Sequence, residues 1–148
     1  KFKKYSKEYR EANKDKLKLH RQANKHKINE RDKVRRTIEP LYKMSCNLRS
    51  RTSMAFRNKG YKKSSKTQEM LGVDWEVCKA HIENQFTEGM NWGNRGSWHI
   101  DHIIPLASAK NEDELMKLCH YRNLQPLWAE DNLKKSAKIQ GQQTYFKL

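Results

Sequence analysis

An acid and an imidazole stand side by side in an apolar stretch of the chain. Asp101 directly precedes His102 within residues 98–105, which also hold three isoleucines. Successive side chains of an extended chain point to opposite faces, so Asp101 shares a face with His99 and His102 shares one with Ile100. Burying an acid or an imidazole is costly unless it is paired or binds a metal. Asp101 and His102 are therefore either a structural pair or a reactive one.

The residue types favour metal-assisted hydrolysis. The Asp101 carboxylate, an asparagine amide and water supply hard oxygen ligands of the kind that Mg²⁺ and Mn²⁺ prefer. A histidine such as His102, with an ordinary pKa near neutrality, can accept a proton from water. A hydrogen-bonded structural pair remains the alternative.

Two strands and a helix would position these residues. In residues 98–105 and 123–128, apolar and polar residues alternate, and each stretch ends in or near a proline. Residues 129–135 have a short helical pattern. Between the strands, Asn111 followed by Glu114 predicts a capping box for a short helix.

A further helix is expected ahead of the first strand. Asp74 is a good N-cap for residues 75–85, in which Cys78, Ile82 and Phe86 recur at helical spacing. This apolar stripe predicts that the helix covers the two strands.

Three separated motifs resemble the HNH endonucleases. They are Asp101-His102 with Pro105 behind it, Asn123 in Asn-Leu-Gln-Pro-Leu, and Asn132 in Glu-Asp-Asn-Leu-Lys-Lys. The resemblance covers roughly residues 70 to 138 and is closest to phage-encoded and intron-encoded members. It implies an α+β fold with a ββα-metal catalytic core, in which a β-hairpin packs on a helix around one metal ion.

The resemblance also implies a role for each site residue. Asp101 would bind the metal, and His102 would be the general base that activates water. Asn123 would brace the hairpin by bonding backbone near His102. Asn132 stands where many relatives have histidine, which makes this the H-N-N variant and Asn132 the second ligand. His99 would contact the scissile phosphate or the leaving oxygen, or simply pair with a neighbour.

The expected cofactor is one Mg²⁺ or Mn²⁺ ion, because an amide oxygen is a hard, neutral ligand that disfavours zinc. No structural zinc is expected either, since Cys46, Cys78 and Cys119 form no C-x-x-C pair. The cysteines are read as small core residues in a reducing compartment.

Charge is distributed very unevenly along the 148 residues. Residues 1–66 hold 23 Lys and Arg against 6 acids, whereas residues 67–148 hold 9 against 11. A near-neutral half joined to a strongly basic half is typical of a protein held on a polyanion. No broad apolar face accompanies the basic residues, and we see no signal peptide or membrane span, so no membrane partner is expected. Since the first residue is Lys, we expect a trimmed start.

A weak repeat of 11 residues relates residues 9–18 to residues 20–29. Eleven residues are close to three helical turns, so the repeat predicts a basic ridge on one face of a helix. Such an arm could contact DNA phosphates at intervals. The alternatives are a surface helix or a segment that orders only on binding.

Pro40 starts a second helical region, with a helix over 41–58 that ends near Gly60. The expected domains are a basic DNA-contacting arm (1–39), an Arg-rich helix and linker (40–66), the HNH nuclease domain (67–140) and a C-terminal tail (141–148). The expected DNA-binding residues are Arg10, Lys14, Arg21, Lys25, Arg49, Arg51, Arg57, Arg95, Lys134, Lys135 and Lys138.

The function that these observations predict is a metal-dependent DNA endonuclease that hydrolyses phosphodiester bonds, of the site-specific nicking or homing type. One active site cuts one strand, so the enzyme would be a monomer or a dimer assembled on double-stranded DNA. The resemblance implies a phage gene and the cytoplasm of a bacterial host. The alternatives are a non-catalytic DNA-binding module with a vestigial HNH site and an HNH restriction or packaging nuclease.

Overall fold

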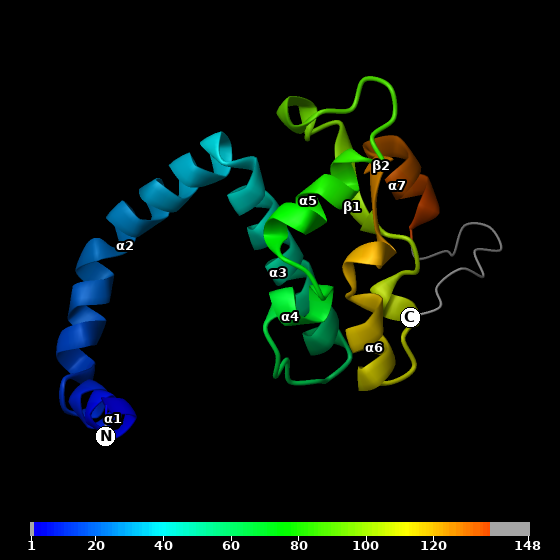
Figure 1. The fold of residues 1–148 in the computed structure, drawn as a ribbon. Helices are drawn as coiled ribbons and strands as arrows, with labels where there is room; N and C mark the ends of the chain where they lie inside the picture. The colour runs from blue at the N-terminus through cyan, green and yellow to red at the C-terminus, as the bar shows by residue number, and fades with distance from the viewer. Residues whose placement is uncertain (1, 137–148) are drawn as a thin grey trace. The chain divides into compact units, whose positions relative to one another are not determined.

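The computed structural model describes residues 2–136, with side chains from residue 6 onward, and shows an α+β protein (Figure 1). The chain divides into two compact units, and the boundary falls between Glu39 and Pro40. The Arg-rich helix that begins at Pro40 belongs to the second unit, together with the β-hairpin. Lys138 and the predicted tail lie outside the described residues.

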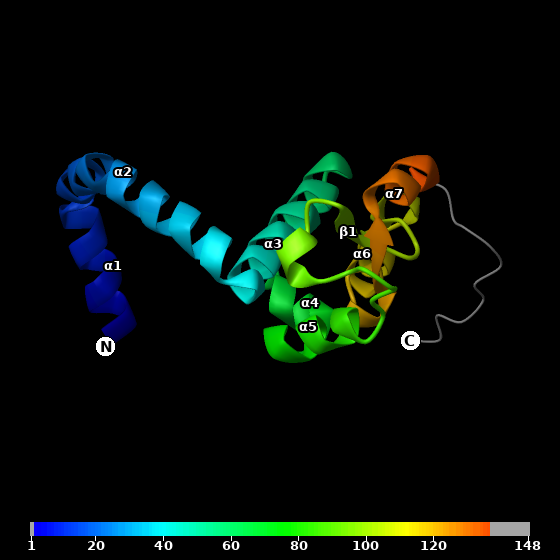
Figure 2. The same ribbon diagram turned by 90° about the horizontal axis from the view of Figure 1, so that it is seen from above.

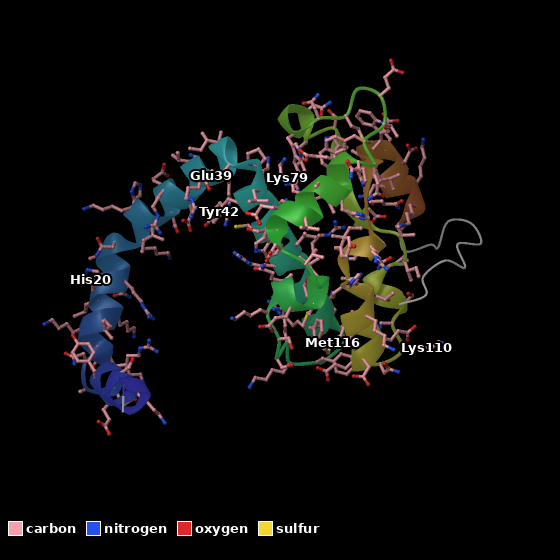
Figure 3. All side chains as sticks on the ribbon, viewed as in Figure 1. His20, Glu39, Tyr42, Lys79, Lys110 and Met116 are labelled. Carbon is pink, nitrogen blue, oxygen red and sulfur yellow. The ribbon has the colours of Figure 1, made fainter. Side chains whose placement is uncertain are left out.

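The first unit is helical. Its helices are α1 (Phe2–Ala12) and α2 (Lys14–Ile38), and the chain changes direction between them at Asn13 (Figure 2). No residue of α2 is buried, and Leu19, Ile28 and other apolar side chains are exposed. Side chains such as His20 project outward from the helix (Figure 3). The described part of this unit therefore has little core of its own.

The second unit is built on an antiparallel hairpin of β1 (Trp98–His102) and β2 (Leu124–Trp128). The helix α7 (Ala129–Lys135) follows β2 and packs on both strands. On the opposite side of the hairpin lie α3 (Pro40–Asn58) and α5 (Trp75–Glu83), as Figures 1 and 2 show. The remaining elements are α4 (Thr67–Leu71), α6 (Glu112–Leu118) and three short 3₁₀ turns at Trp92–Asn94, Leu106–Ser108 and Tyr121–Asn123.

The register of the hairpin explains how β2 tolerates a proline. Just beyond the strands, Ile103 N–H donates to Asn123 O at 2.8 Å. From this pair on, hydrogen-bonded pairs alternate with non-hydrogen-bonded pairs along the ladder. Pro126 faces Ile100, three pairs away, at a non-hydrogen-bonded position. Its missing N–H therefore costs no bond in the ladder.

On each outer edge of the hairpin, backbone carbonyls that do not pair with the other strand accept hydrogen bonds from side chains of helices. Exposed strand edges would otherwise leave unpaired backbone groups. The donors are Arg51 Nη1 of α3 to Ile100 O, Lys135 Nζ of α7 to His102 O (2.6 Å), and His81 Nε2 of α5 to Leu124 O (3.1 Å). Charged and polar side chains of three helices thus fix the hairpin in place.

Trp98 is the centre of the main hydrophobic core. It is fully buried, and its ring packs edge-on against Phe86 and Trp92 at centroid distances of 4.9 and 5.4 Å. Residues of α3, α5 and both strands complete this core, and a second cluster surrounds Phe56 and Leu115. Cys78 and Ile82 of α5 are buried in this core together with residues of both strands. The prediction that this face of the helix packs against the strands is therefore confirmed.

Candidate functional site

Two pockets lie along one face of α3, and Arg51 lines both. The His102 pocket has a volume of about 640 Å³ and the Arg95 pocket one of about 340 Å³. The His102 pocket is lined by Arg51, Met54, Ala55, Asn58, Lys59, Asp101, His102, Pro105, Leu106, Ala107 and Ser136. The Arg95 pocket is lined by Lys43, Asn47, Leu48, Ser50, Arg51, Arg95, Trp98, His99, Ile100 and Asn132.

His102 lies at the end of β1 and is only 6% exposed. Its ring lines the His102 pocket, and its ring nitrogens make no hydrogen bond with another side chain or backbone group of residues 6–136. Burial lowers the pKa of His102 to about 4, and the charges of Arg51 and Lys135 act in the same direction, against Asp101. The imidazole is therefore uncharged near neutral pH.

Asp101 is paired with a lysine. Its Oδ2 atom accepts from Lys135 Nζ at 2.5 Å and from Gln125 Nε2 at 3.3 Å. Lys135 is 2% exposed and donates its other two protons to the carbonyls of His102 and Ile103, at 2.6 and 3.0 Å. The ammonium group thus uses all three of its donors inside the protein.

This geometry corrects one expectation. Lys135 was predicted to contact DNA phosphates, but it is buried against β1. It lies three residues after Asn132, so both occupy the strand-facing side of α7. Leu133, between them, is 76% exposed. The buried stripe of α7 is polar because β1 presents polar groups to it.

Asn132 and His99 are in direct contact. Asn132 Nδ2 lies 3.0 Å from His99 Nδ1, so the ring nitrogen accepts and His99 Nε2 carries the proton. This bond turns the Asn132 Oδ1 atom away from His99. No described residue donates a hydrogen bond to that oxygen.

Asn123 holds the two ends of the hairpin segment together. It is fully buried, and its Oδ1 accepts from Ile104 N–H at 2.8 Å. Its Nδ2 donates to Ile104 O at 3.0 Å and to Leu118 O at 2.7 Å. The side chain thus bonds backbone two residues beyond His102 and fixes the path of the chain that leaves β1.

The donor set fits a hard metal ion only in part. Oδ1 of Asp101 and Oδ1 of Asn132 accept no hydrogen bond from a described residue, and oxygen ligands suit Mg²⁺ or Mn²⁺ rather than zinc. However, Asp101 and Asn132 line different pockets. Residues 2–136 contain no group of three His, Cys, Asp or Glu side chains that could hold a metal. Water would have to complete the coordination.

The four basic residues of the first unit that were predicted to bind DNA share one surface. Arg10, Lys14, Arg21 and Lys25 all line a single hollow of about 650 Å³ along α1 and α2. Lys18, which the 11-residue repeat did not single out, lines it as well. Among the described residues that line it are five cations and one carboxylate, Glu11.

Among the other predicted DNA-binding residues, Arg51 and Arg95 line pockets and three remain at the surface. Arg49 stacks over the Trp75 ring at 5.1 Å, and Arg57 is exposed. Lys134 is exposed and lies 3.7 Å from Asp131.

Sequence reasoning missed the polar face of α3. Lys43, Asn47 and Arg51 recur at four-residue spacing and line the Arg95 pocket; Arg51, Met54 and Asn58 continue along the His102 pocket. The spacing was visible in the sequence. Met54, an apolar residue on this face, is 55% exposed.

The fold and site define an α+β protein with a β-hairpin that helices hold in place. The first strand of this hairpin ends in an Asp and a His. No family model matches the sequence, and no solved structure matches it. Two proteins of Acanthamoeba polyphaga mimivirus are similar to it. Uncharacterized protein L426 is 37% identical over 93% of this chain and 69% of its own length. Uncharacterized protein L246 is 36% identical over 70% of this chain and 46% of its own length.

The chain belongs to the same family as uncharacterized protein L426. It spans about two thirds of that relative and less than half of uncharacterized protein L246. Both relatives come from a virus of an amoeba, whereas the resemblance of the motifs pointed to phage genes. Among residues 2–136, no helix is long and apolar enough to cross a membrane.

Proposed function

We propose that this protein is a metal-dependent endonuclease of the HNH class that hydrolyses phosphodiester bonds in double-stranded DNA. The observation that carries the proposal is the state of the His102 ring. It is buried beside Asp101, it has no hydrogen-bonding partner among residues 6–136, and it lines a pocket that also holds Arg51 and Lys59. A proton acceptor next to cations that attract a phosphate is the arrangement that hydrolysis needs.

In this proposal His102 takes the proton from the attacking water. A positioned general base typically contributes roughly 10²- to 10⁴-fold to the rate. Asn123 acts as a positioning residue, because its bonds to Ile104 hold the backbone just beyond His102. Arg51 faces the same pocket and attracts the phosphate to be cut.

Asp101 and Asn132 are the residues that would hold the metal, each through its Oδ1 oxygen. When bound, Mg²⁺ or Mn²⁺ supplies Lewis-acid polarisation of the phosphate and stabilises the departing oxygen. His99 holds the Asn132 amide in its orientation through the 3.0 Å bond to Nδ2. These three residues and His102 come from β1 and α7, which together with β2 would form the ββα core in this proposal.

DNA is the favoured substrate because of the charge distribution. Residues 1–66 carry a net charge of +17, from 23 basic and 6 acidic residues. The hollow lined by Arg10, Lys14, Arg21 and Lys25 gathers part of that charge on one surface. A chain that carries both a long basic arm and one active site favours a site-specific enzyme that cuts one strand at a time.

One observation favours the rival function of a non-catalytic DNA-binding module. The Lys135 ammonium already neutralises Asp101. A divalent cation beside this ammonium would meet electrostatic repulsion. In a binding module the Asp101–Lys135 pair would serve only to fasten α7 to β1.

Incubation of supercoiled plasmid with the protein separates these functions. The nuclease produces open circles in Mg²⁺ or Mn²⁺ and none in EDTA. The binding module retards the plasmid on a gel and leaves it intact in every buffer. Because a plasmid can lack a specific site, DNA from the virus that encodes the relatives is assayed in parallel.

A further inference from the structure

The Arg95 pocket brings positive charges together. Lys43, Arg51 and Arg95 line it, and no carboxylate of residues 6–136 lies in its lining. Neither arginine forms an ion pair with a carboxylate of residues 6–136. Burial, and then the charge of Arg51, lower the pKa of Arg95 to about 10. Two guanidinium groups in such proximity repel each other unless an anion joins them.

Arg95 is held in place by aromatic rings. Its Cζ atom lies 5.5 Å from the Trp92 ring centroid and 5.7 Å from that of Trp98. The Trp98 ring is itself fixed by hydrogen bonds from Nε1 to Asn91 O at 2.9 Å and to Asn94 Oδ1 at 3.2 Å. The guanidinium is therefore preorganised, and little conformational entropy is lost when it binds a ligand.

One nitrogen of Arg95 lacks a partner among the described residues. Its Nη1 atom is shielded from solvent and makes no hydrogen bond with residues 6–136. A buried donor without a partner costs about 1–3 kcal/mol and calls for an explanation. His99 also lines this pocket and directs its protonated Nε2 away from Asn132. Several donors and no charged acceptor are typical of an anion site.

We infer that the Arg95 pocket binds one phosphate group of the DNA backbone, held by Arg95, Arg51 and Lys43. The inference rests on the proposed function in that the ligand is DNA. Arginine binds phosphate with paired N–H groups, and such contacts position the nucleic acid without reading its sequence. Because Arg51 also lines the His102 pocket, the bound phosphate belongs to the strand that is presented to His102.

The test measures binding of a fluorescent duplex in EDTA, so that no cleavage takes place. The salt slope is the slope of log K for DNA binding against log salt concentration. It is about −0.9 for each DNA phosphate that the protein contacts. Arg95→Met is expected to weaken binding to unrelated duplexes equally and to reduce the salt slope by about 0.9. Lys43 is exposed and lines the Arg95 pocket, so Lys43→Gln keeps the fold and reduces the slope as well.

Arg122→Met is the matched control. Arg122 is also an arginine stacked on a ring, 5.8 Å from the Tyr121 centroid, but it lines neither pocket. Its replacement removes the same charge and should leave the slope unchanged. Equal changes of the salt slope in Arg95→Met, Lys43→Gln and Arg122→Met would overturn the inference. The slope would then depend only on the overall positive charge of the protein.

Inorganic phosphate distinguishes the source of the ligand. Its binding is followed by the fluorescence of Trp92 and Trp98, which lie beside Arg95. A response to inorganic phosphate that requires Arg95, together with DNA binding that does not, would overturn the assignment to DNA backbone. A protein that binds DNA through Arg95 but cuts none in any metal would leave this inference standing and refute the proposed nuclease.

Discussion

Lys135 Nζ lies 2.5 Å from Asp101 Oδ2, and both side chains are almost completely buried. The pair joins α7 to β1 directly beside His102. Taking two charges out of water is costly, and their attraction compensates only when the geometry is good and the other donors are satisfied. Lys135 meets that condition, because its two remaining protons bond the carbonyls of His102 and Ile103. The pair therefore sets the relative position of the helix and the strand that form the proposed site.

Breaking this pair should destabilise the protein strongly. Lys135→Met leaves a buried carboxylate and Asp101→Asn leaves a buried ammonium, and each should cost about 3–5 kcal/mol. The double variant should cost less than the sum of the two, since no uncompensated charge remains. Urea denaturation of the three variants gives the coupling energy. Strictly additive costs would show that the two groups do not interact.

Asn123→Ala should also destabilise the protein. The change removes the partners of Ile104 N–H, Ile104 O and Leu118 O, at about 1–3 kcal/mol for each group that stays buried and unpaired. Asn47→Ala, on the exposed face of α3, is the control and should change stability by less than about 0.5 kcal/mol. Equal thermal midpoints for the two variants would contradict the bracing role of Asn123.

The three thiols should differ in reactivity. Burial raises the pKa of Cys78 and of Cys119 to about 11, so at pH 8 neither contains much of the reactive thiolate. Cys46 is half-buried. In the native protein at pH 8, the reaction with a thiol reagent should therefore have a rapid phase, in which one cysteine is modified, and a slow phase. Cys46→Ser should abolish the rapid phase. Raising the pH toward 10 should speed the slow phase, because more thiolate then forms. Three equal rates at pH 8 would contradict the burial of Cys78 and Cys119.

Much of the second unit followed from local patterns in the sequence. Alternation marked both strands, and the Asn111 cap marked α6, where Asn111 Oδ1 accepts from Glu114 N–H at 2.8 Å. These signals are local, so a single sequence contains them. The short helix α4 was not predicted, because Thr67–Leu71 is too short to show a period.

The partners within the site could not be read from the sequence. Lys134 and Lys135 are adjacent and of one type, yet one is exposed and the other is buried. Their difference is set by which side of α7 meets β1, and this depends on the register of the hairpin. Arg51 and Arg95 are likewise brought to one pocket by the tertiary structure, although they lie 44 positions apart in the sequence (95 − 51). Neither position carries a local signal of the other.

The measurement that tests the central claim most directly is the nicking rate of His102→Ala beside the wild type, with DNA affinity determined on the same preparations. Circular dichroism establishes that the variant is folded, and His20→Ala, in the exposed first unit, is the control for loss of an imidazole. We predict that His102→Ala binds DNA as tightly as the wild type and cuts it roughly 10²- to 10⁴-fold more slowly in Mg²⁺ or Mn²⁺. A folded His102→Ala protein that nicks DNA at the wild-type rate would contradict the assignment of His102 as the base.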